Sequence, residues 1–230
     1  MSSTSVLLVG ASGLVGRHLL QLLLHESVYE RIAVLVRKPL AVSHTRLTQH
    51  VVDFDRLDHH KEIIRADDVF CCLGTTIRAA GSQEAFRKVD FTYVVQTAAL
   101  ASKHGARQFL MVSSLGANVG SKIHYSRVKG EVEQAVSKLP FVGIHIFRPS
   151  MLLGERAESR RGEKAGIAAM KLFSFAMVGP WKKYRPIHAQ YVANAMIRVA
   201  STGLHGVNIF ESDRIQILGS SRDKHLDTSH

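Results

Sequence analysis

Residues 4–20, TSVLLVGASGLVGRHLL, hold the pattern that decides the fold. A short apolar run ends in a glycine-rich segment, and leucines at helical spacing follow directly. This order is typical of a buried strand that enters a tight turn and continues into a helix. Gly10, Gly13 and Gly16 would let the turn approach a ligand, and the helix N-terminus would offer free N–H groups to an anion. The stretch predicts a turn that binds the pyrophosphate of a dinucleotide, with a purely structural tight turn as the alternative.

The rest of the chain repeats the alternation of apolar strands and helices. Helices are expected at 58–65, 83–105 and 125–139, and strands at 31–37, 47–54, 67–74, 106–114 and 141–150. Strands that are apolar throughout belong to parallel sheets covered on both faces. The sequence therefore predicts an α/β fold with a doubly wound parallel sheet.

Domain organisation follows from length and from a change in pattern after Ser150. A chain of 230 residues is expected to form one domain, 1–230. The alternation weakens beyond residue 150, so residues 151–218 are predicted to form a small cap beside the carboxyl ends of the strands. The polar segment 219–230 is predicted to be a frayed tail.

Composition narrows the class of protein. Hydrophobic residues make up 46% of the chain and charged residues 21%, which is typical of globular proteins. No apolar run approaches the roughly 18 residues of a membrane span, and the N-terminus lacks the basic region of a signal peptide. A cytoplasmic location without a membrane partner is expected. The net charge of +11 would suit a nucleic acid, but Lys and Arg are scattered, which favours an anionic small molecule and a solvated basic surface.

The cysteines and histidines indicate neither a disulfide nor a metal. Cys71 and Cys72 are adjacent, and neighbours in sequence do not readily form the usual disulfide geometry. They are expected to be buried thiols. None of the thirteen histidines joins a cluster at metal-ligand spacing, so no metal is predicted.

The choice of dinucleotide depends on the end of the strand predicted at 31–37. Arg37 and Lys38 stand there, whereas Glu30 lies at the opposite end. A basic side chain at this place can hold a ribose 2′-phosphate, so NADP(H) is favoured over NAD(H). The two residues could also be ordinary polar residues leaving a strand. Asp53 could accept a hydrogen bond from the adenine amino group, or it could serve only as a turn former.

A candidate catalytic group follows the strand predicted at 106–114. Ser113 and Ser114 end that strand, and Tyr125 and Lys129, four residues apart, share one face of the next helix. An ammonium group near a tyrosine favours its ionised form, and a serine can hydrogen-bond the same carbonyl oxygen. By itself a Tyr-x-x-x-Lys pair is common on charged helices. After a dinucleotide-binding turn, it indicates a proton donor beside a cofactor.

Five segments together resemble the atypical short-chain dehydrogenase/reductase family, and within it the Tat-interactive-protein-like oxidoreductase group. They are GASGLVG (10–16), CCLGTT (71–76), VSSLGA (112–117), YSRVKGEVE (125–133) and FRPSMLLGER (147–156). The resemblance implies a Rossmann fold that binds NADP(H). It also implies that Ser114 binds the carbonyl, that Tyr125 is the acid/base and that Lys129 is a ribose ligand, with Ser113 less suited than Ser114.

The same resemblance implies the remaining cofactor contacts. These would come from Gly10, Ser12, Gly13, Leu14, Val15 and Gly16 of the glycine-rich turn, from Leu73, Gly74 and Thr75, from Ser113 and Tyr125, and from Arg148, Pro149 and Ser150 after Phe147. One position departs from the family: Asp90 stands where many extended members have an asparagine. It could face the site, or it could be a carboxylate on a helix surface. The basic residues Arg156, Arg160, Arg161 and Lys164 lie where the family places substrate contacts. They could bind an anionic substrate, but a solvated loop is the preferred interpretation.

Three functions remain possible at this point. The first is an NADPH-dependent reductase of a small carbonyl compound, working as a monomer or homodimer. The second is a regulatory or scaffold protein that binds NADPH without turnover. The third is a nucleotide-sugar epimerase or dehydratase, for which the predicted cap is small.

Overall fold

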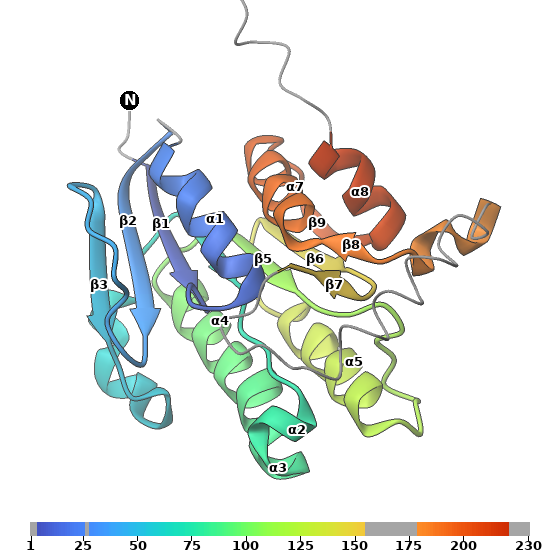
Figure 1. Ribbon diagram of the computed structural model, residues 1–230. Coiled ribbons are helices and arrows are strands. Elements are labelled where there is room, and N and C mark those ends of the chain that lie inside the picture. The colour runs from blue at the N-terminus through green and yellow to red at the C-terminus, as the bar shows by residue number, and fades with distance from the viewer. Residues whose placement is uncertain (1–3, 26–27, 155–178, 221–230) are drawn as a thin grey trace, which may run out of the picture.

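The computed structural model describes residues 4–25, 28–154 and 179–220, and its centre is a seven-stranded parallel sheet (Figure 1). The strand order is β3-β2-β1-β4-β5-β6-β9. The strands are β1 Thr4–Val9, β2 Tyr29–Val36, β3 Leu47–Val51, β4 Asp68–Cys71, β5 Gln108–Val112, β6 Gly143–Arg148 and β9 Gly206–Glu211. The order reverses at β1 and β4, so the predicted doubly wound α/β fold is confirmed.

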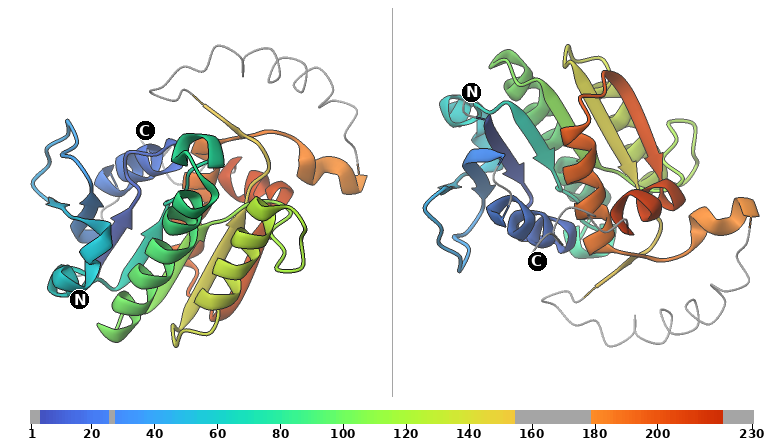
Figure 2. Two further views of the ribbon diagram at one scale, coloured as in Figure 1. Left: turned by 90° about the horizontal axis from the view of Figure 1, so that it is seen from below. Right: turned by 90° about the horizontal axis from the view of Figure 1, so that it is seen from above.

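Helices cover both faces of this sheet (Figure 2). One face carries α1 Leu14–His25, α7 Ala189–Ser201 and α8 Ser212–Ser220. The other carries the 3₁₀ segment η1 Phe54–Ile63, α4 Tyr93–Lys103 and α5 His124–Val136. Shorter pieces are α2 Ile77–Ala80, α3 Gln83–Arg87, the π-helical η2 Lys88–Thr92, the 3₁₀ segment η4 Gly179–Tyr184, and the strand pair β7 Leu152–Leu153 and β8 Ile187–His188.

The burial of β1 explains why its sequence is apolar throughout. Val6 and Leu8 belong to the core beneath α1 and α7, whereas Leu7 and Val9 belong to the core beneath α4 and α5. Side chains alternate between the two faces of a strand, and here both faces are covered. An uninterrupted apolar run is therefore what this central strand requires.

The C-terminal part corrects the prediction of a cap at 151–218. Strand β9 pairs in parallel with β6, from Gly143 opposite Gly206 to Arg148 opposite Glu211, and so forms the edge of the main sheet. Helix α7 packs beside α1 on the same face (Figure 1). The physical reason is that the strands beyond β1 need a cover on this face, and Val192, Met196 and Val199 of α7 provide it. Residues 155–178, with the basic loop, and 221–230, with most of the predicted tail, lie outside the described residues.

The helix predicted at 83–105 is divided into α3, η2 and α4. In the middle of it, the Tyr93 N–H donates to the Lys88 carbonyl oxygen, five residues back. Such a π turn holds one residue more than an α turn and changes which side chains face inward. This local change sets the position of Asp90.

Candidate functional site

The glycine-rich turn joins β1 to α1 at the point where the strand order reverses. Gly10 has a φ of +85°, and a Cβ atom there would lie 2.6 Å from the Cys72 carbonyl carbon and oxygen. A Cβ on Gly16 would lie 2.1 Å from the Gly10 carbonyl oxygen. The Gly13 N–H donates to that same oxygen at 3.0 Å. The close approaches require glycine at both positions, because any side chain would collide with the backbone.

Arg37 and Lys38 follow β2 at the same edge of the sheet as this turn. Val9 lies opposite Leu35 in the register of β1 and β2, so Gly10 and the residues after Val36 leave the sheet side by side. Both basic side chains are exposed. Their position is compatible with a phosphate near the start of α1.

Asp53 caps the segment that follows β3. One of its carboxylate oxygens, Oδ1, accepts the Asp55 N–H at 2.9 Å, and its backbone is extended as in other N-caps. The residue is exposed. The turn-forming role is therefore present in the structure, and its contact with an adenine stays a prediction.

The segment Leu73–Thr75 follows β4 next to the glycine-rich turn and is held in place by a hydrogen bond to Asp90. The Thr75 N–H donates to Asp90 Oδ2 at 2.8 Å. A Cβ on Gly74 would lie 3.5 Å from Asp90 Oδ1 and 3.7 Å from Lys129 Nζ. The turn thus passes directly over the Asp90 and Lys129 side chains.

Asp90 and Lys129 form a buried ion pair. Lys129 Nζ lies 2.7 Å from Asp90 Oδ1, and the side chains are 5% and 0% exposed. Asp90 is therefore not a carboxylate on a helix surface, and the π turn of η2 is what points it inward. Burial alone would lower the pKa of Lys129, but the Asp90 carboxylate, together with Tyr125 and Cys71, acts more strongly in the other direction, and the pKa of Lys129 is raised. Lys129 is charged at neutral pH.

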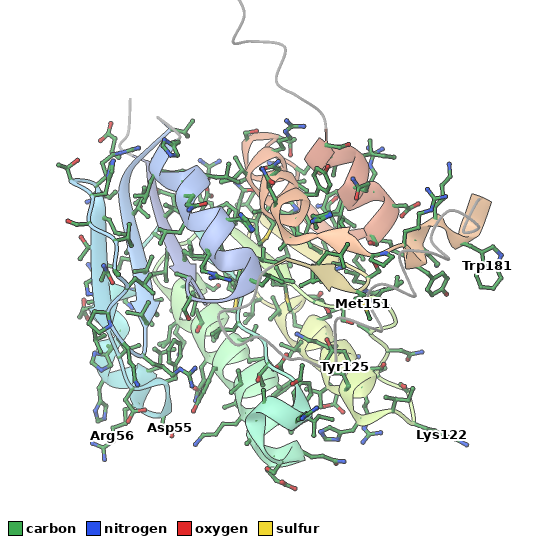
Figure 3. All side chains as sticks on the ribbon, viewed as in Figure 1. Asp55, Arg56, Lys122, Tyr125, Met151 and Trp181 are labelled. Atoms are coloured by element: carbon green, nitrogen blue, oxygen red, sulfur yellow. The ribbon has the colours of Figure 1, made fainter. Side chains whose placement is uncertain are left out.

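Tyr125 lies on the first turn of α5, one turn before Lys129 (Figure 3). Its ring packs against Phe86 with centroids 5.3 Å apart, and the residue is partly buried. Ser114 is also partly buried, and its hydroxyl donates to the Leu115 carbonyl oxygen at 3.2 Å. Among the described residues, the Tyr125 hydroxyl has no hydrogen-bond partner and the Ser114 hydroxyl has only the carbonyl oxygen of its neighbour, which suits groups that contact a bound molecule.

Ser113 has a different role from its neighbour. It is 5% exposed, and its hydroxyl donates to the Glu133 carboxylate. Arg148 binds the same carboxylate, with Nε 3.0 Å from Oε1. The Arg148 guanidinium, which the family resemblance assigned to the cofactor, is thus held in a structural ion pair. Glu133 was missed from the sequence, although it lies four residues after Lys129.

Pro149 and Ser150 stand next to the serine strand. The Leu115 N–H donates to the Pro149 carbonyl oxygen at 2.9 Å, which brings Ser114 beside this turn. The Ser150 hydroxyl donates to the Arg185 carbonyl oxygen and lies 3.0 Å from the Ser212 hydroxyl. The sequence-predicted residues of β1, β4, β5, α5 and β6 therefore meet at one edge of the sheet.

Within the described part of the chain, no group of three or more His, Cys, Asp or Glu residues could hold a metal ion. No described helix is long and apolar enough to cross a membrane. Burial raises the pKa of the Cys71 thiol to about 11, so this thiol is protonated and unreactive at neutral pH.

Comparison with known proteins identifies the family of the chain. Residues 10–161 match the family described as NAD(P)H-binding. Protein HTATIP2 of Rattus norvegicus is 36% identical over 97% of this chain and 92% of its own length. The mitochondrial protein fmp52 of Aspergillus fumigatus is 33% identical over 94% of this chain and 95% of its own.

Solved structures are similar in fold at low identity. A UDP-glucose 4-epimerase of Thermotoga maritima, solved with UDP-glucose, has a TM-score of 0.67 at 15% identity and covers 94% of this chain and 80% of its own. The Bordetella bronchiseptica enzyme WbmH in complex with NAD+ has a TM-score of 0.69 at 14% identity, over 91% of this chain and 76% of its own. The chain belongs to the NAD(P)H-binding family and is an atypical short-chain dehydrogenase/reductase of the HTATIP2 group.

Proposed function

We propose that the protein is an NADP(H)-dependent oxidoreductase that reduces a small carbonyl compound. The observation that carries this proposal is the position of Tyr125 one helical turn from Lys129, which is buried and charged. A reduced nicotinamide, when bound, supplies the hydride that adds to the carbonyl carbon. The residues that would hold the dinucleotide are those of the 10–16 turn, whose glycines leave no room for side chains.

Each residue of the site has a part in the reduction. The Tyr125 hydroxyl donates its proton to the carbonyl oxygen as negative charge develops there. The Ser114 hydroxyl donates a hydrogen bond to the same oxygen and holds it in place. The Lys129 ammonium stabilises the phenolate that remains on Tyr125 and binds the ribose. The products are the alcohol and NADP+.

NADP(H) rather than NAD(H) is proposed because of Arg37 and Lys38. Two exposed basic residues leave β2 beside the glycine-rich turn, and Glu30 lies at the other end of that strand. A guanidinium can donate two parallel hydrogen bonds to a 2′-phosphate. An acidic residue at the same place would repel that phosphate.

The test is NADPH oxidation measured with a panel of aldehydes, ketones and quinones. We expect turnover by the wild type with at least one compound. Tyr125→Phe should lose most of it, by about 100-fold or more, because general acid catalysis contributes factors of this size. The matched control is Tyr93→Phe, which removes a hydroxyl that donates to Asp55 away from α5. An equal rate in wild type and Tyr125→Phe would contradict the assigned mechanism.

A second function is favoured by the ion pair itself. The Asp90 carboxylate offsets the charge of Lys129, so the site could bind NADPH firmly as a regulatory protein without turnover. Tight NADPH binding with no oxidation across the whole panel would support this alternative. Detection of any compound that is turned over would reject it.

We propose a monomer or homodimer whose ligands are the dinucleotide and a small carbonyl compound, with no nucleic acid and no membrane. A cytoplasmic location is proposed from the composition, whereas the names of the fungal relatives point to mitochondria. Sedimentation of the purified protein and fractionation of cells that express the full chain would test both points.

A further inference from the structure

Asp90 holds two groups that come from different parts of the chain. It lies on η2 and is fully buried. Its Oδ1 lies 2.7 Å from the Lys129 ammonium of α5, and its Oδ2 accepts the Thr75 N–H at 2.8 Å. One carboxylate thus joins the turn after β4 to the helix that carries Tyr125.

The chemistry of these two contacts requires an acid. A carboxylate has two oxygens that both accept hydrogen bonds. It can therefore accept the backbone N–H with one oxygen and form an ion pair with the lysine through the other. An asparagine has one accepting oxygen, and its NH₂ group would face one of the two donors. At this position, asparagine could keep one contact but not both.

A pair of this kind is not explained by stability alone. Removing a carboxylate and an ammonium from water costs much of what their attraction returns, and a well-packed apolar pair would often do as well. A need for these two groups to be charged and held in fixed positions would explain why the pair is present.

We propose that Asp90 is a positioning residue of the cofactor site, which holds the Lys129 ammonium and the Leu73–Thr75 turn as one rigid unit before the dinucleotide binds. This inference rests on the proposed function, because it takes Lys129 and that turn to face the cofactor. Because these groups are already ordered, no conformational entropy is lost in ordering them when the dinucleotide binds. The affinity for the dinucleotide is therefore higher.

Three titratable groups of the described residues act on the charge of Lys129: Asp90 on η2, Tyr125 on α5 and the Cys71 thiol on β4. The Glu133 carboxylate, one turn further along α5, is already bound by Arg148 and Ser113. Without Asp90, burial would dominate, and the ammonium would lose its proton at a lower pH.

The first experiment uses the wild-type protein without cofactor. Hydrogen exchange followed by NMR should find the Thr75 amide strongly protected, and protection should change little when NADPH is added. A Thr75 amide that exchanges freely and becomes protected only with NADPH would overturn the inference. This measurement needs no variant, so it holds even where a variant fails to fold.

The second experiment measures NADPH affinity of Asp90→Asn at pH 7.0 and 9.5. We expect a loss of between about tenfold and 100-fold at pH 7.0, the size of one charge-assisted hydrogen bond. The loss should be larger at pH 9.5, where the unpaired Lys129 is neutral, whereas the wild type should show no such added loss. Glu62→Gln, which removes an exposed carboxylate paired with Arg65, is the control and should bind as the wild type does.

The outcomes distinguish a failure of the proposed function from a failure of the positioning role alone. A wild type that binds neither NADPH nor NADH rejects the proposed function. A wild type that binds, together with a folded Asp90→Asn of equal affinity, rejects only the positioning role. A loss of affinity that is the same at both pH values also rejects it, because a purely structural defect would not follow the charge of Lys129.

Discussion

The Arg148 guanidinium at the end of β6 is bound to the Glu133 carboxylate of α5, with Nε 3.0 Å from Oε1 and 3.2 Å from Oε2. Glu133 is 5% exposed and also accepts the Ser113 hydroxyl. This arrangement anchors α5 to the ends of β5 and β6. The helix that carries Tyr125 and Lys129 is therefore fixed at one end by Glu133 and beside the cofactor turn by Asp90.

Loss of the Glu133 charge should destabilise the protein. Glu133→Gln leaves the Arg148 charge partly buried without its partner, and we expect a cost of about 2–4 kcal/mol in the free energy of unfolding. Urea unfolding followed by circular dichroism measures it. Glu131→Gln is the matched control on the same helix: its partner Arg87 is half-exposed, so the change should cost less than about 1 kcal/mol. Equal losses in the free energy of unfolding for the two variants would show that the buried pair stabilises the protein no more than the exposed pair does.

Removal of the Asp90 charge should make stability depend on pH in a defined direction. The raised pKa of wild-type Lys129 means that its contribution is fully present at neutral pH and is lost only as pH rises through that raised value. In Asp90→Asn, burial lowers the pKa of Lys129 in the folded state below that of the unfolded chain. The variant is then least stable near neutral pH and recovers toward pH 10.

Thermal unfolding of the wild type and Asp90→Asn between pH 7 and pH 10 checks this expectation. The difference in Tm should narrow as pH rises. Glu62→Gln again serves as control, since its partner is exposed. A constant difference in Tm across this range would mean that the lysine does not respond to the loss of Asp90.

A side chain at Gly16 should disrupt the dinucleotide turn. In Gly16→Ala the new Cβ would lie 2.1 Å from the Gly10 carbonyl oxygen, so the start of α1 must move away from β1. We expect both a lower Tm and a loss of NADPH binding by at least about tenfold. Gly120→Ala is the control, because its Cβ would meet only the Asn118 side chain, at 3.4 Å. Unchanged NADPH binding in Gly16→Ala would argue against a ligand at this turn.

The basic residues after β2 should discriminate between the two dinucleotides. In Arg37→Ser/Lys38→Ser, we expect the Kd for NADPH to rise by about tenfold or more while the Kd for NADH stays nearly constant. Titration of NADPH and NADH fluorescence gives both values. Arg65→Ser, at the other end of the sheet, controls for the general loss of positive charge. A parallel loss for both cofactors would remove the reason for preferring NADP(H).

The fold could be predicted because its signals are local. The apolar run of β1, the three glycines and the leucines of α1 lie within seventeen consecutive residues, 4–20. The edge strand β9 was assigned to a cap because the alternation of strands and helices weakens after Ser150. In the structure, its side chains Val207 and Ile209 are exposed, unlike those of the strands inside the sheet. An edge strand has fewer neighbours and need not be apolar throughout, so its pattern does not indicate a parallel sheet.

The residue types of the candidate site could be predicted from the sequence, but the contacts between these residues could not. Ser114, Tyr125 and Lys129 follow recognisable spacings, whereas the inward position of Asp90 depends on one π turn that helical periodicity does not encode. Glu133 shares the face of Lys129, but its partners Ser113 and Arg148 are 20 and 15 residues away in sequence. Contacts of that kind are determined by how strands and helices pack, and no local pattern indicates them.

His145 should make the protein less stable in mild acid. It is fully buried on β6, contacts Gln108 through Nε2 at 3.1 Å, and burial lowers its pKa to about 4. The unfolded chain binds a proton near pH 6.5 and the folded state does not, so stability falls as pH drops from about 6.5 to 4, by up to about 3 kcal/mol. Urea unfolding at pH 7.0, 5.5 and 4.5 measures this loss. His145→Gln, which can still hydrogen-bond Gln108, should show a smaller decline, whereas the exposed-site control His59→Gln should decline as the wild type does. An equal decline in His145→Gln and the wild type would assign the acid sensitivity to other groups.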